Sequence, residues 1–116
     1  MQNSIKHLLM LSATFLAACT NTMSGSNSRV DFDSHLLLAE ISREKQEFQQ
    51  AAEHYLTASL MVEDPGLARL TTELAQQLGL NEIGTQAAQR WQELRPDDTN
   101  VHQYLGVFKL RANDRE

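Results

Sequence analysis

The sequence FQQAAEHYLTASLMVEDP, residues 48–65, carries the clearest structural signal in this chain of 116 residues. Its apolar side chains recur at spacings of three and four residues, which is the period of one face of an α-helix. The dipeptide Asp64-Pro65 then supplies an N-cap carboxylate followed by proline at the first helical position, where the missing N–H costs nothing. One helix is therefore expected to end shortly before Asp64, and another to begin at Pro65.

Similar apolar stripes predict further helices on both sides of this stretch. Asp33 and Ser34 are N-cap candidates for a first helix over 34–46, and Gly79 is expected to end the third helix. No stretch is convincing as a β-strand, so the sequence predicts an all-α fold. The helices expected after the one that begins at Phe48 cover 65–78, 81–95 and 99–112.

The expected helices come in pairs, and the proline breaks at Pro65 and Pro96 give a period of roughly thirty residues. On this basis the chain resembles a tetratricopeptide repeat (TPR) protein, in which helix–turn–helix units stack into a solenoid. A generic α-helical bundle with the same apolar stripes is the alternative. The resemblance covers 32–116 as units over 32–64, 65–98 and an incomplete 99–116, or about two and a half repeats.

The resemblance assigns packing roles to small and aromatic residues. Helices approach closely where Gly or Ala faces the partner, and large side chains fill the grooves. The second repeat is weaker than the first, because Thr72 stands where a small residue is usual and Trp91 where alanine is usual. The expected packing residues are Ala39, Phe48, Ala51, Tyr55, Ala58, Gly79, Gly84, Ala88, Trp91, Leu105 and Gly106.

A separate signal lies near the N-terminus, where Lys6 precedes an apolar run of eleven residues over 8–18. A membrane-spanning helix needs ~20 such residues, so the run has the length of a signal-peptide core. It ends in Leu16-Ala17-Ala18-Cys19, which resembles the lipobox of bacterial lipoproteins at all four positions. The resemblance implies a signal peptide over 1–18 and a covalent lipid on the Cys19 thiol. A plain secretory signal with a coincidental cysteine is the alternative.

The lipobox also implies a location. Thr20 follows the cysteine where an aspartate would indicate retention in the inner membrane, so we expect a cell-envelope protein anchored in the outer membrane and facing the periplasm. The small polar residues over 19–31 predict a flexible tether. A net charge of −5 offers no basic patch for nucleic acid or for an anionic membrane surface.

The sequence holds no recognisable catalytic or metal-binding motif. The four histidines show no metal-ligand spacing, no serine lies in a nucleophile elbow, and no glycine loop could cradle a phosphate. Cys19 would be consumed by the lipid. We therefore expect no metal, no cofactor apart from that lipid, and no enzymatic activity. The histidines are His7, His35, His54 and His102.

The expected helix over 99–112 presents an apolar edge. Tyr104, Leu105 and Phe108 lie on it, and no further helix follows to cover what they leave exposed. Full burial of such side chains is worth ~1.5–3 kcal/mol each. Either the chain is a truncated piece of a longer TPR lipoprotein, or this edge docks onto a partner or a second copy of the chain.

The two resemblances together imply a membrane-anchored scaffold for protein–protein interaction, active in envelope or outer-membrane assembly, because TPR families generally bind peptides or proteins in a concave groove. The first alternative is the docking and tether module of an envelope enzyme, such as a peptidase or wall-modifying enzyme, whose catalytic part lies elsewhere. The second is a truncated, non-functional fragment. The expected groove residues are Arg69, Gln76, His102, Gln103 and Lys109.

Overall fold

The computed structural model describes residues 28–114 of the chain. The chain divides into two units, Met1–Asp31 and Phe32–Glu116. Of the first unit, the described residues 28–31 are helical. The fold described below is that of the second unit, over 32–114.

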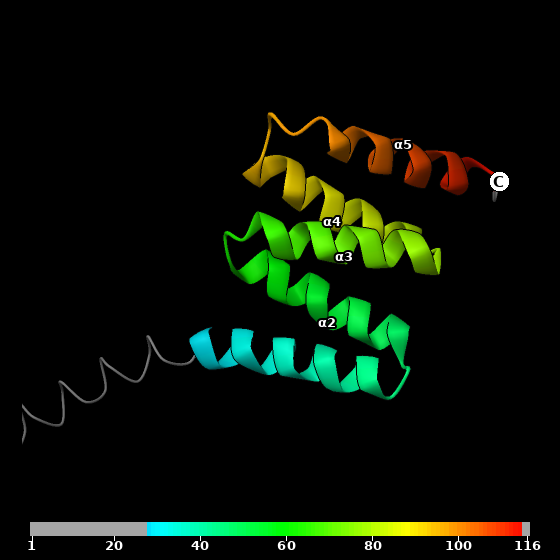
Figure 1. The fold of residues 1–116 in the computed structure, drawn as a ribbon. Coiled ribbons are helices and arrows are strands. Elements are labelled where there is room, and N and C mark those ends of the chain that lie inside the picture. The colour runs from blue at the N-terminus through cyan, green and yellow to red at the C-terminus, as the bar shows by residue number, and fades with distance from the viewer. Residues whose placement is uncertain (1–27, 115–116) are drawn as a thin grey trace, which may run out of the picture. The chain divides into compact units, whose positions relative to one another are not determined.

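Five helices follow one another in the described part of the second unit, which confirms the all-α fold class (Figure 1). The expected bounds of the third helix are confirmed, and those of the fourth and fifth agree to within a single residue. The helices are an unlabelled first helix over 32–44, α2 (Phe48–Met61), α3 (Pro65–Leu78), α4 (Asn81–Leu94) and α5 (Asn100–Asn113).

Helix α3 has a side-chain cap at its start and a backbone cap at its end. The Asp64 carboxylate accepts hydrogen bonds from the backbone N–H groups of Gly66 (2.9 Å) and Leu67 (3.3 Å). At the other end Gly79 adopts the left-handed conformation (φ 71°), and Leu80 N donates to the Ala75 carbonyl at 2.9 Å. This is the Schellman arrangement, and glycine adopts it without a Cβ penalty.

The first helix ends in the same way without a glycine. Gln46 has a φ of 63°, and Glu47 N donates to the Ser42 carbonyl at 2.8 Å. Its predicted start at residue 34 is wrong, because residues 28–31 and the residues that follow them are already helical. Asp33 and Ser34 therefore lie inside helical sequence and cannot be N-caps. Residues 28–31 also belong to the segment expected as tether, the rest of which lies outside the described residues.

Two clusters of buried side chains hold the helices together. The first cluster consists of Tyr55, Ala39 and Ala51, and three leucines pack against it. In the second, Trp91 and Phe108 pack with Ala68, Ala88 and Val101. Each cluster joins three helices, so a helix buries one face against its predecessor and another against its successor. The leucines of the first cluster are Leu36, Leu67 and Leu74.

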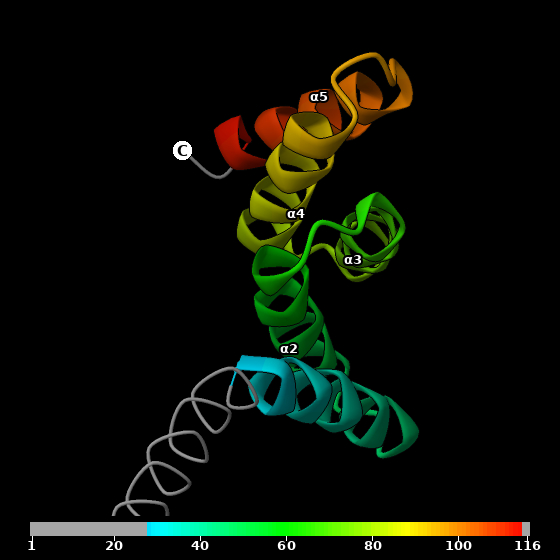
Figure 2. The same ribbon diagram turned by 90° about the vertical axis from the view of Figure 1, so that its left-hand side faces the viewer.

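The helices stack in sequence order. Helix α3 packs against α2 and most extensively against α4, and α4 packs against α5. Smaller contacts join α2 to α4 and α3 to α5, whereas α2 and α5 do not meet. Figure 2 shows α3 to one side of α2 and α4. Each of the helices α2 to α5 therefore contacts only the helices one or two places away along the chain.

Two arginines connect helices that are not sequence neighbours. Arg90 of α4 donates from Nε to the Ser59 carbonyl at 3.2 Å and from Nη2 to the Val62 carbonyl at 2.9 Å, at the end of α2. Arg111 of α5 donates to the Gln76 carbonyl at 3.1 Å, near the end of α3. In both cases a guanidinium satisfies C-terminal carbonyls of the helix two places earlier, where the helix dipole favours positive charge.

Candidate functional site

Most of the residues expected to pack between helices are buried. Gly84 of α4 lies against the ring of Phe108 of α5, so closely that a Cβ at this position would overlap three of its ring atoms. Trp91 is 2% exposed although it stands at a position where alanine was expected. Gly79 forms the turn between α3 and α4. The buried members of the expected set are Ala39, Ala51, Tyr55, Ala58, Gly84, Ala88 and Trp91.

Three members of that set are placed differently. Phe48 is 41% exposed at the start of α2, and Leu105 is only partly buried against the second cluster. Gly106 is exposed, and a Cβ built there would meet nothing within 4 Å. Close approach of a neighbouring helix therefore requires glycine at position 84 but not at position 106 in the described structure.

The residues expected in a groove do not gather into one group. Arg69 pairs with Glu73 at 2.9 Å on the surface of α3, and its guanidinium lies 5.7 Å from the centre of the Trp91 ring. The Glu73 carboxylate raises the pKa of Arg69. Gln76 contributes its backbone carbonyl to Arg111, as described above, so its role in the described structure is that of a helix end.

The three groove candidates of α5 are all exposed: His102, Gln103 and Lys109. The Arg111 side chain forms a hydrogen bond from α5 to α3. On an α-helix successive residues turn by ~100°, so His102 lies ~180° around α5 from Arg111 and Lys109 lies ~160° from it. These two side chains therefore leave the helix on the side away from α3, and a groove shared by α3 and α5 would not contain them.

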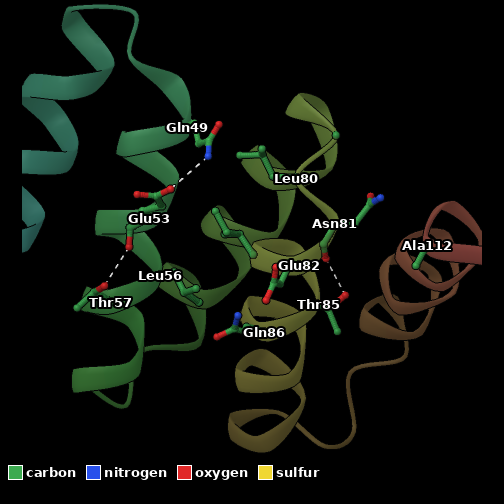
Figure 3. Close-up of a pocket in the computed structure, with 12 residues that line it drawn as sticks. Gln49, Glu53, Leu56, Thr57, Leu80, Asn81, Glu82, Thr85, Gln86 and Ala112 are labelled. Carbon is green, nitrogen blue, oxygen red and sulfur yellow. Dashed lines mark hydrogen bonds between the residues drawn. The ribbon is translucent and has the colours of Figure 1, made fainter. Parts of the chain in front are cut away.

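A hollow of ≈ 730 Å³ lies elsewhere, between α2, the turn that precedes α4, the first half of α4, and the end of α5 (Figure 3). In Figure 3 the labelled side chains of α2 stand on one side and those of α4 on the other. We call it the α2–α4 pocket. It is lined by Gln49, Glu53, Leu56, Thr57, Gly79, Leu80, Asn81, Glu82, Ile83, Thr85, Gln86 and Ala112.

The lining of the α2–α4 pocket combines an apolar part with hydrogen-bond acceptors. Leu56, Leu80 and Ile83 provide the apolar part, whereas Glu53 and Glu82 bring carboxylates from different helices. Neither carboxylate forms an ion pair with any of the residues that the structure describes. Together these groups suit a ligand that has both apolar atoms and hydrogen-bond donors.

Some polar groups of the pocket are already occupied and others are not. Gln49 Nε2 donates to Glu53 Oε1 at 3.3 Å, and the Thr85 hydroxyl donates to the Asn81 carbonyl at 2.7 Å. The Asn81 Oδ1 atom is buried and has no hydrogen-bond partner. Leu80, the N-cap residue of α4, offers no side-chain cap to the first N–H groups of that helix. The uncapped N–H groups at the start of α4 therefore retain hydrogen-bonding capacity, whereas Asn81 Oδ1 is closed off from solvent.

Two other polar sites lie away from this pocket. A second hollow, of ≈ 590 Å³, is lined by Arg69, Trp91 and Asp98 among others, and Trp91 Nε1 donates to Asp98 at 3.2 Å. His35 and His54 approach each other with their Nδ1 atoms 3.2 Å apart. Over residues 28–114 no three His, Cys, Asp or Glu side chains come together as metal ligands would.

Sequence reasoning missed the α2–α4 pocket. Its residues come from separate stretches around 49–57 and 79–86 and from Ala112, and none of these stretches contains a motif. The one local signal is the acidic residue Glu82 in the first turn of α4, but that residue type is common at helix starts and marks no site by itself. The lipobox residues Leu16 to Cys19 lie outside the described residues.

The architecture is an all-α fold of sequential packed helices with an open pocket between α2 and α4. No known protein family matches the chain, and no curated protein matches its sequence. No helix among residues 28–114 is long and apolar enough to cross a membrane.

Proposed function

We propose that the chain is a lipid-anchored scaffold that binds a peptide segment of a partner protein in the cell envelope. The observation that carries the proposal is the α2–α4 pocket, which is open, is lined by several helices and borders the start of α4, where no side chain caps the first N–H groups. Its volume of ≈ 730 Å³ lies within the ~300–1,000 Å³ common for ligand sites.

The proposal includes TPR-like repeats as the architecture of the scaffold. Helices that contact only their first and second neighbours support it, as do the two equivalent arginine bridges from α4 to α2 and from α5 to α3. A stack of this kind presents a long surface relative to its core, which suits the binding of extended segments.

The proposal also includes a lipid on Cys19 and a place in the outer membrane, facing the periplasm. The Leu16-Ala17-Ala18-Cys19 sequence is its support. Two or more acyl chains on one residue would hold the domain at the membrane durably, since each buried CH₂ contributes ~0.8 kcal/mol. The mass of the protein extracted from its own membranes tests this part: a mature chain that begins at an acylated Cys19 agrees with it, and an intact unmodified Cys19 contradicts it.

Chemical cross-linking in intact envelopes tests the binding role. The variant Gln86→Trp places a large side chain in the pocket from an exposed position, and Gln103→Trp places the same side chain on the exposed face of α5. We expect a cross-linked partner to be lost from Gln86→Trp and kept by Gln103→Trp. The reverse pattern would move the binding site to α5, and equal recovery from both would refute a role for the pocket.

A further inference from the structure

We infer that the α2–α4 pocket takes a basic segment, in which a lysine or arginine side chain of the partner peptide lies between Glu53 and Glu82. The inference rests on the proposed binding function and specifies the chemistry of the ligand. Two features of the pocket carry it: the sign of its charges and its apolar lining.

The charge of the pocket is of one sign. Both ionisable side chains in the lining are carboxylates, and the twelve lining residues include no Lys, Arg or His. The arginines of α3 and α4 form ion pairs elsewhere, Arg69 with Glu73 and Arg90 with Glu93. Glu53 and Glu82 are left to an external cation, and two carboxylates on facing helices attract one more strongly than either alone.

The apolar lining fits the stem of such a side chain. Leu56 and Leu80 lie among the same lining residues as the two carboxylates. Lysine and arginine bury a methylene stem along apolar surface while their charged end stays with polar partners. A small inorganic cation would gain nothing from these leucines, whereas a basic peptide side chain uses both parts of the pocket.

Two carboxylates favour a donor-rich side chain. A guanidinium carries five N–H donors and an ammonium three, so either can donate to both Glu53 and Glu82. The backbone N–H groups at the start of α4, which no side chain caps, can in turn donate to the carbonyl groups of a peptide backbone.

The test is a binding titration of the full chain in non-ionic detergent. The probes are three fluorescein-labelled octapeptides that differ only at two positions, where one carries arginine, one glutamine and one glutamate. We expect the arginine peptide to bind, the glutamine peptide to bind at least tenfold more weakly, and the glutamate peptide not to bind. The affinity of the arginine peptide should fall as salt is raised, because exposed charges are screened.

Matched charge-removing variants separate the pocket from the overall negative charge of the protein. Glu53→Gln and Glu82→Gln should each weaken the arginine peptide about tenfold, whereas Glu63→Gln, in the exposed turn before α3, should change its affinity less than twofold. Equal weakening by all three would overturn the inference, because it would show non-specific attraction to an acidic protein. Thermal unfolding of each variant confirms that it folds.

The outcomes also separate this inference from the proposed function. If the glutamine peptide binds as tightly as the arginine peptide and both are blocked by Gln86→Trp, the pocket is a peptide site and the charge inference is wrong. Tighter binding of the glutamate peptide would overturn the inference in favour of the α4 N–H groups as the recognition element. If no peptide binds while cross-linking to a partner still depends on Gln86, the pocket binds a part of the partner that is not a basic segment. That outcome refutes the charge inference and leaves the proposed function standing.

Discussion

Replacing Gly84 by alanine is expected to destabilise the domain, although alanine is the better helix former. A Cβ at this position would overlap the Cζ, Cε1 and Cε2 atoms of Phe108, whose side chain is 1% exposed. Forcing an extra carbon into a packed core costs ~1–3 kcal/mol. The gain in helix propensity offsets ~1 kcal/mol of that cost. The expected net loss is therefore up to ~2 kcal/mol.

Gly106 provides a matched control on the neighbouring helix. It is also helical, but it is exposed and has nothing within 4 Å of a Cβ built on its backbone. Gly106→Ala should therefore stabilise the domain by ~0.5–1 kcal/mol, since only the propensity gain and the reduced freedom of the unfolded chain operate. The two glycine substitutions are predicted to have opposite signs.

Thermal unfolding of the full chain in detergent, followed by circular dichroism, measures both effects. In a domain of this size 1 kcal/mol corresponds to a shift of ~4–8 °C, so Gly84→Ala should lower Tm by up to ~16 °C and Gly106→Ala should raise it by ~2–8 °C. Adding Phe108→Leu to Gly84→Ala should cost less than it costs in the wild type, because the shorter side chain relieves the overlap. A Gly84→Ala variant as stable as Gly106→Ala would refute the close packing of α4 on α5.

Three further predictions concern helix ends and ionisation. Arg90→Met should cost ~2 kcal/mol in urea unfolding, because it removes the charged donor to carbonyl groups at the end of α2, whereas Arg95→Met, at an exposed position, should stay within ~0.5 kcal/mol of the wild type. Asp64→Ala removes the cap of α3 and should cost ~1 kcal/mol, which Asp64→Asn should largely restore. Burial and the hydrogen bond from Tyr55 to Glu40 raise the pKa of the Tyr55 phenol, so the neutral form stabilises the fold below the ordinary tyrosine pKa and this stability is lost as the pH rises through the folded-state pKa. Alkaline unfolding curves should therefore show a steeper loss of stability for the wild type than for Tyr55→Phe, and parallel curves would contradict this reading.

The parts of the fold that local chemistry controls could be predicted from the sequence. Helix α3 begins at Pro65 and ends at Leu78 as expected, because Asp64 caps one end and Gly79 takes the left-handed conformation at the other. These signals act within a few residues and do not depend on the rest of the fold. The burial of Tyr55 also follows from the spacing of small residues on either side of it in α2.

The first helix shows where local signals mislead. Asp33 and Ser34 favour N-cap positions, but residues 28–32 contain no glycine or proline that would stop a helix from passing through them. At the other end the helix stops at Gln46 in the left-handed conformation, which non-glycine residues seldom adopt. Neither boundary is marked by the residue types that mark the ends of α3.

The α2–α4 pocket could not be predicted, because it depends on how far apart two non-adjacent helices lie. Its position depends on how α3 and α4 pack together and on the place where the chain turns at Gly79. The same limit explains the groove residues. Periodicity identified exposed positions on α5, but the side that faces α3 is shown by the cluster that Val101 and Phe108 form with Ala68 and by the bond from Arg111 to Gln76. Sequence patterns predict which side chains are buried more readily than which surfaces meet.

The arginine bridges affect how the domain opens. In a simple stack each helix holds only its immediate neighbours, so an end helix can detach while the remainder stays folded. Here Arg90 ties α4 to the end of α2, and Arg111 ties α5 to α3. Detachment of α5 would therefore also release the carbonyl group that it holds on α3. These hydrogen bonds should make three helices, rather than two, open together as one cooperative unit. The backbone amides of α3 and α5 should therefore exchange with solvent in one shared opening event.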